Sequence, residues 1–121
     1  MAGERTLLIV EDNAAVCSAI RSFMARNGGW DIVLTANDAG RGLLLASEHK
    51  PEAIVLDNRM PGGNGIDVLE ALRETCPDSI IVMHTSDDST DVRLAAEQLG
   101  ADAVVSKGRP LGELAAFIDV A

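Results

Sequence analysis

Five short apolar runs, each followed by polar or turn-forming residues, recur along the chain. They cover residues 6–10, 31–36, 53–56, 80–83 and 103–105. Apolar runs bounded by turn residues are typical of strands that are buried on both faces of a parallel sheet. The second run has polar neighbours, which favours a position at the edge of the sheet.

Helical periodicity fills the segments between these runs. Asn13 can cap a helix whose apolar residues Val16, Ile20 and Phe23 share one face, and the sequence Asn-Gly-Gly at 27–29 ends it. The later segments carry similar signals. Asn37 or Asp38 can cap a second helix that stops before Pro51, and Pro77 ends a third helix. Gly100 ends a fourth helix, and Pro110 opens the last one. Alternating strands and helices predict an α/β fold, namely a three-layer (βα)5 flavodoxin-like domain with a parallel five-stranded sheet of order 2-1-3-4-5.

Composition narrows the classes of protein that fit this pattern. With 121 residues, the chain is predicted to form one domain over 1–121, and with 2% aromatic residues its core must be aliphatic. The formal net charge of −9 disfavours direct binding to nucleic acid or to an anionic membrane. The first apolar run is too short for a signal peptide or a membrane span, so a cytoplasmic protein is expected. Cys17 and Cys76 lack CxxC spacing and are predicted to be reduced, buried thiols.

Polar residues that could carry chemistry follow four of the five apolar runs directly. They are Glu11 with Asp12, Asp57, Thr85 and Lys107. Each has an ordinary structural interpretation when taken singly, as a turn, cap, strand-end or surface residue. The carboxyl ends of parallel strands lie at one edge of a sheet, however, so three carboxylates, a hydroxyl and an ammonium are predicted to meet in one pocket.

Such a pocket has the chemistry of phosphoryl transfer. Clustered carboxylates need a cation, and a site of hard oxygen ligands without His or Cys favours Mg²⁺. Asp carboxylates can accept a phosphoryl group covalently, and a nearby Lys and Thr can neutralise and position its oxygens.

At this point the chain resembles a bacterial response-regulator receiver domain over residues 5–120. The resemblance rests on Glu11-Asp12, on the segment 57–65 that begins Asp57-Asn58-Arg59, on Thr85-Ser86, and on Lys107 after Gly100-Ala101-Asp102. It implies that Asp57 takes a phosphoryl group from a phosphohistidine of a sensor histidine kinase or phosphotransfer protein. It also implies that Asp12, Asp57 and the Arg59 backbone carbonyl ligate Mg²⁺ with help from Glu11, and that Thr85 and Lys107 bind the phosphoryl oxygens. A receiver of this kind phosphorylates and dephosphorylates itself and is not a turnover enzyme on external substrates.

Two departures from the family pattern concern how phosphorylation is read out. Receivers usually carry an aromatic residue three positions before the lysine, where this chain has Val104, so we expect altered coupling to the helix 4, strand 5 and helix 5 face. Gly108 follows Lys107 where many receivers have a cis-proline. The Lys-Gly pattern resembles receivers attached to helix-turn-helix output domains of the LuxR/NarL type. The chain is therefore either a stand-alone receiver or part of a longer transcription regulator, and it is a possible homodimer.

Several residues around the pocket are expected to modulate the chemistry. Arg59 and Asp87 could pair across its mouth and shield the phosphorylated aspartate, or they could be solvated loop charges, and Ser86 lies beside them. His84 should point away from the Thr85 side and serve a structural role.

Two other classes of protein are alternatives to a receiver. A hydrolase of the haloacid dehalogenase type needs a second acid two residues after the nucleophile, where this chain has Arg59. A pseudo-receiver would bind partners without phosphorylation, but the chemical residues expected of a receiver are all present.

Overall fold

The computed structural model describes residues 4–60, 63–87 and 89–118. Five parallel strands form the main sheet, in the order β2-β1-β3-β6-β7. Their bounds are β1 Thr6–Val10, β2 Ile32–Ala36, β3 Ala53–Asp57, β6 Ile80–Thr85 and β7 Ala103–Ser106. The five helices are α1 Ala14–Asn27, α2 Ala39–His49, α3 Gly65–Thr75, α4 Thr90–Gln98 and α5 Leu111–Ile118. The predicted flavodoxin-like fold and its strand order are confirmed.

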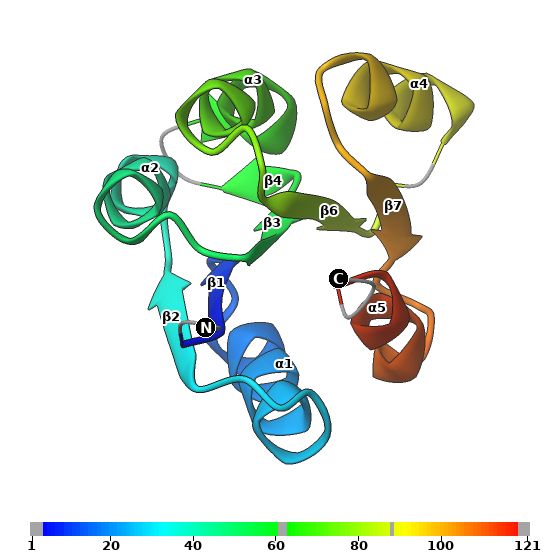
Figure 1. Ribbon diagram of the computed structural model, residues 1–121. Coiled ribbons are helices and arrows are strands. Elements are labelled where there is room, and N and C mark those ends of the chain that lie inside the picture. The colour runs from blue at the N-terminus through cyan, green and yellow to red at the C-terminus, as the bar shows by residue number, and fades with distance from the viewer. Residues whose placement is uncertain (1–3, 61–62, 88, 119–121) are drawn as a thin grey trace.

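The sheet lies between two helical layers (Figure 1). Helices α1 and α5 cover one face, and α2, α3 and α4 cover the other. The alternation of side chains along each strand divides the core accordingly, so that Leu7 and Ile9 pack toward α1 and α5, whereas Leu8 and Val10 pack toward the other layer. Both layers are built almost entirely from aliphatic side chains, as the composition predicted. Among the described residues, no helix is long and apolar enough to cross a membrane.

Side-chain caps start the helices at the predicted positions. Asn13 accepts a hydrogen bond from the Val16 amide, and Asp38 accepts one from the Arg41 amide, so Asp38 rather than Asn37 caps α2. At the end of α4, Gly100 has a φ of +109°, which only glycine adopts at low cost.

The structure corrects two details of the predicted elements. Strand β6 extends to Thr85, so His84 and Thr85 belong to the strand and do not follow it. Within the segment expected to be a loop, the short strands β4 (Arg59–Met60) and β5 (Gly63–Asn64) pair in antiparallel fashion, although Pro61 and Gly62 between them lie outside the described residues. The pairing carries the chain from the end of β3 back to the start of α3.

Arginines tie the amino edge of the sheet together, opposite the edge at which the strands end. Arg5 donates to the Gly28 carbonyl and to Glu52, and its guanidinium lies 4.1 Å from the centre of the Trp30 ring. Arg73 of α3 donates to the Gly100 carbonyl and to carbonyls of the α3–β6 loop. The stabilising polar contacts at this edge leave the carboxyl edge available for chemistry.

Candidate functional site

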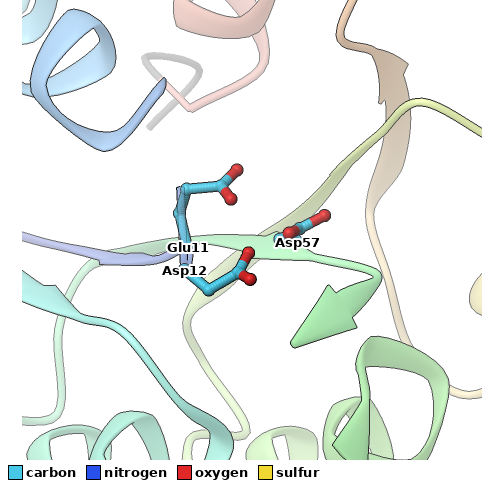
Figure 2. Close-up of side chains that lie close together, drawn as sticks. All are labelled: Glu11, Asp12 and Asp57. Atoms are coloured by element: carbon cyan, nitrogen blue, oxygen red, sulfur yellow. The ribbon is translucent and has the colours of Figure 1, made fainter. Parts of the chain in front are cut away.

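Three carboxylates gather at the ends of β1 and β3. One oxygen from each of Glu11, Asp12 and Asp57 lies within 4.8 Å of the others (Figure 2). The Glu11 amide donates to the Ala36 carbonyl, which continues the β1–β2 pairing and fixes the start of the acidic pair. Glu11 and Asp57 are buried, whereas Asp12 is exposed. The predicted meeting of these acids at one edge is therefore found in the structure.

Gly65 holds the backbone around Asp57 in place. Its amide donates to the Asn58 carbonyl at 2.6 Å. A Cβ atom at Gly65 would lie 2.6 Å from the Asp57 carbonyl oxygen and 2.8 Å from the Asn58 Cα. Only glycine fits there, which allows α3 to start directly against the strand end that carries the carboxylate.

Lys107 brings a cation to two of the acids. Its Nζ lies 2.8 Å from Glu11 Oε1 and 3.2 Å from Asp57 Oδ1. Burial alone would lower the pKa of Lys107, but the hydrogen bond to Glu11 and the charges of Asp57 and Glu11 outweigh it, so the pKa is raised. The ammonium is therefore charged at neutral pH and held between the carboxylates.

The pocket carries more negative charge than one lysine balances. Burial raises the pKa of Glu11, and the neighbouring Asp57 raises it further, although the hydrogen bonds from Lys107 and the Asn13 amide act in the opposite direction. The donor set consists of carboxylate oxygens with Asp12 open to solvent. Oxygen donors with an open side match a hard divalent cation that keeps part of its water shell, such as Mg²⁺.

Thr85 lies at the end of β6, next to β3 in the sheet, and is buried. Its hydroxyl accepts a hydrogen bond of 3.0 Å from the Asp87 amide. Within the described part of the chain, that hydroxyl bonds neither Asp57 nor Lys107. The structure thus brings the three acids and Lys107 into contact, and it places Thr85 at the same edge with its hydroxyl engaged by the loop that follows.

The residues expected to modulate the pocket have mixed placements. Arg59 and Ser86 are exposed, and no ion pair joins Arg59 to Asp87 among the described residues. Val104 is buried in the layer beneath α4. Arg93 of α4 donates to the Val104 carbonyl at 3.1 Å, a link that was not predicted because its acceptor is a backbone atom and carries no sequence signal.

His84 is buried on the sheet face that also carries Asp57. It pairs in register with Asp57 of β3 and Val105 of β7, and it alternates with Thr85 as predicted. Neither ring nitrogen has a hydrogen-bond partner among the described residues. Burial and, to a lesser extent, the Lys107 charge lower the pKa of His84 to about 4, despite the opposing charge of Asp57. The ring is therefore neutral at physiological pH and packs as an apolar group.

The two cysteines are free, but only Cys76 is buried and Cys17 is half-buried. The prediction of reduced thiols is confirmed for both, and the prediction of burial is wrong for Cys17. Cys17 lies on α1 beside the acids, and burial raises the pKa of its thiol. It is not an activated nucleophile.

The family model, the curated relatives and the solved structures that match this chain all concern response regulators. The family model for the response regulator receiver domain matches residues 7–119. The KDP operon transcriptional regulatory protein KdpE of Escherichia coli is 37% identical over 115 residues, which are 95% of this chain and 50% of that protein. Response regulator MprA of Mycobacterium leprae is 37% identical over 112 residues, or 93% of this chain and 48% of that protein. The chain thus spans about half the length of these relatives. A solved DNA-binding response regulator of the LuxR family from Staphylococcus aureus matches with a TM-score of 0.87 and 25% identity over 95% of this chain and 96% of that one.

Proposed function

Because the chain belongs to the response regulator receiver domain family, we propose that it acts as the phosphorylation-dependent input of a two-component system, with Asp57 as the phosphoacceptor. The observation that carries this proposal is the contact of Lys107 Nζ with both Glu11 and Asp57 at the acidic edge of the sheet. A nucleophilic carboxylate, a fixed cation and spare acids are the groups that phosphoryl transfer needs in one place.

Each side chain has a distinct task in this proposal. A carboxylate oxygen of Asp57 attacks the phosphorus while the phosphorus–nitrogen bond of the donor's phosphohistidine breaks, and the imidazole nitrogen keeps the electron pair. Lys107 would then pair with the transferred group in place of the carboxylate. The Thr85 hydroxyl exchanges the Asp87 amide for a phosphoryl oxygen. Asp12, Asp57 and the Arg59 carbonyl would hold Mg²⁺, and Glu11 would help through water. The ion supplies charge neutralisation of the phosphoryl oxygens.

The partners follow from this role. The phosphoryl donor would be a phosphohistidine of a sensor histidine kinase or phosphotransfer protein, and the reader would be an output domain or partner at the face formed by α4, β7 and α5. KdpE and MprA are about twice as long as this chain. KdpE is named a transcriptional regulatory protein, which supports a role of this chain in transcription regulation.

The proposal is tested with small phosphodonors in place of the kinase. Acetyl phosphate with Mg²⁺ should add one phosphoryl group to the wild type, detected by intact-protein mass spectrometry, and Asp57→Asn should remain unmodified. Beryllofluoride with Mg²⁺ should shift the amide NMR signals of β7 and α5 in the wild type only. Equal modification of Asp57→Asn would refute the role of Asp57 and would place the phosphoryl group on another residue. No response of the wild type to either reagent would refute it as well and would favour a pseudo-receiver.

Arg59 and Asp87 are proposed to lengthen the life of the phosphorylated state by shielding it from water. Arg59→Ala should then dephosphorylate several-fold faster than the wild type, whereas Arg26→Ala, which removes an exposed arginine of α1, should not change the rate. The loss of phosphoprotein is followed on phosphate-affinity gels. Equal rates for Arg59→Ala and the wild type would show that the two charges are simply solvated.

Val104 is proposed to alter how phosphorylation reaches the output face. A ring at this position could change rotamer, which the branched, buried valine cannot do. Val104→Tyr should therefore change the beryllofluoride-dependent NMR shifts over β7 and α5, while the rate of phosphorylation by acetyl phosphate stays the same. Identical shift patterns, together with unchanged partner affinity, would contradict this role.

A further inference from the structure

Helix α4 is held against the sheet by few apolar contacts. All of its residues are described, and among them only Ala96 is buried, while Val92 packs half-buried against the core. The helix lies beside β7, the last strand of the sheet (Figure 1). Elements with few buried apolar contacts have the lowest local stability and move most easily. The position of α4 therefore depends strongly on its polar contacts.

One polar contact joins α4 directly to β7. The Arg93 guanidinium donates from Nη1 to the Val104 carbonyl oxygen at 3.1 Å in partly buried surroundings. A hydrogen bond from a charged donor is stronger than one between neutral groups. Val104 takes part through its backbone, so the contact does not depend on a rotamer of its branched side chain. Arg93 thereby fixes the position of α4 relative to β7.

A second set of hydrogen bonds connects the start of α4 to the end of β6. The Thr85 hydroxyl accepts from the Asp87 amide at 3.0 Å, and the Asp87 carboxylate accepts from the Ser89 amide at 3.2 Å. Ser89 is the N-cap of α4, because its hydroxyl accepts from the Val92 amide and its carbonyl accepts from the Arg93 amide. The bonds thus form a series from the buried hydroxyl of Thr85 to the arginine that contacts β7.

We propose that Arg93 is a positioning residue that holds α4 on β7 while Asp57 is unmodified and releases it when the Thr85 hydroxyl turns to a phosphoryl group. The proposal rests on the phosphoacceptor role of Asp57 proposed above and adds how that site controls α4. When Thr85 gives up the Asp87 amide, the loop before α4 loses its anchor and the first turn of the helix shifts. Arg93, one turn beyond the cap, then moves out of reach of the Val104 carbonyl.

A contact that phosphorylation breaks must itself weaken the binding of a phosphoryl group or its analogue. Arg93→Met keeps the length of the side chain and removes its donors. With Mg²⁺ present, its Kd for beryllofluoride should be roughly tenfold lower than that of the wild type, because one charge-assisted bond no longer has to break. The loss of a positive charge alone would weaken the binding of this anion, which is the opposite direction. Titration followed by amide NMR signals measures the Kd.

The Val104 carbonyl reports the contact directly. Beryllofluoride should shift its ¹³C NMR signal in the wild type in the same direction as Arg93→Met does without ligand. In the variant, beryllofluoride should shift this signal much less. Arg26→Met, which removes an exposed arginine of α1, is the matched control and should behave as the wild type in both measurements.

Two results would overturn the positioning role of Arg93 alone. The first is an unchanged or higher Kd in Arg93→Met, because Arg93 would then support α4 equally in both states. The second is a Val104 carbonyl signal that stays in place while the wild type binds beryllofluoride. A wild type that binds no beryllofluoride would instead overturn the phosphoacceptor role and, with it, this proposal.

Discussion

The charge of Lys107 allows two carboxylates to lie close together in a buried position. Without this ammonium, the buried carboxylates of Glu11 and Asp57 would repel one another. The ammonium contacts both of them and offsets the repulsion. The contacts also order the site before any phosphodonor arrives. If Asp57 is the nucleophile, as proposed, it is already at contact distance from Lys107, the group proposed to stabilise the transferred oxygens, so little reorganisation is needed.

His84 makes stability depend on pH. Its pKa is about 4 in the folded chain and near 6.5 when exposed, because burial and the Lys107 charge disfavour the protonated ring and the Asp57 charge offsets them only in part. Between these values the unfolded state binds a proton that the folded state does not, so stability falls as the pH is lowered from 6.5 toward 4. Between pH 7.5 and pH 5 the expected loss from this residue is about 2 kcal/mol.

The measurement is urea unfolding at both pH values in the presence of EDTA. His84→Leu should remove about 2 kcal/mol from the difference between the two pH values, and His49→Gln, which replaces an exposed histidine, should not. Wild-type and His84→Leu proteins with the same pH difference would show that His84 does not carry it.

The loops at the amino edge depend on Arg73. Its guanidinium donates to carbonyls of Ser79 and Gly100 and to Asp102, which in turn accepts from the Ile81 amide. One side chain thereby links α3 to the segments that lead into β6 and β7. Arg73→Met should lower the free energy of unfolding by about 2 to 3 kcal/mol, because it leaves partly buried carbonyls without donors.

The control for this change is Arg109→Met, because Arg109, which lies between β7 and α5, also pairs with a carboxylate but is exposed. We expect no measurable shift in its chemical unfolding midpoint. Similar losses for the two variants would mean that the Arg73 contacts contribute no more than a surface ion pair.

Elements that are set by the types of their side chains could be predicted from the sequence, whereas contacts between backbone groups could not. Each strand and the caps at Asn13 and Gly100 were marked by side-chain type, and the site followed from the rule that parallel strands end at one edge. The β4–β5 pairing and the contacts of Arg73 and Arg93 involve backbone groups, which leave no pattern of residue types in the sequence. Thr85 was placed at the correct edge, but the partner of a freely rotating hydroxyl is set by local geometry.

For the molecule as a whole, we expect the acidic site to lower stability and a bound cation to restore it. A chain of net charge −9 places three carboxylates within 4.8 Å of one another. Asp12 is the exposed member, so Asp12→Asn can remove a like charge without leaving a buried group unpaired. In EDTA this variant should be as stable as the wild type or more stable, by up to about 1 kcal/mol.

Mg²⁺ should reverse that order. At ten times its Kd, a ligand that binds only the folded state adds about 1.4 kcal/mol, and Asp12→Asn should lose most of this increment because it lacks a ligand. Glu97→Gln changes the net charge equally on exposed α4 and should keep the full increment. Thermal unfolding with and without Mg²⁺ measures both effects. An Asp12→Asn protein that is less stable in EDTA, or that gains as much from Mg²⁺ as the wild type, would mean that Asp12 supports the fold and not the ion. The expected result would mean that the chain gives up stability at the carboxyl edge so that a cation, and then a phosphoryl group, can bind there.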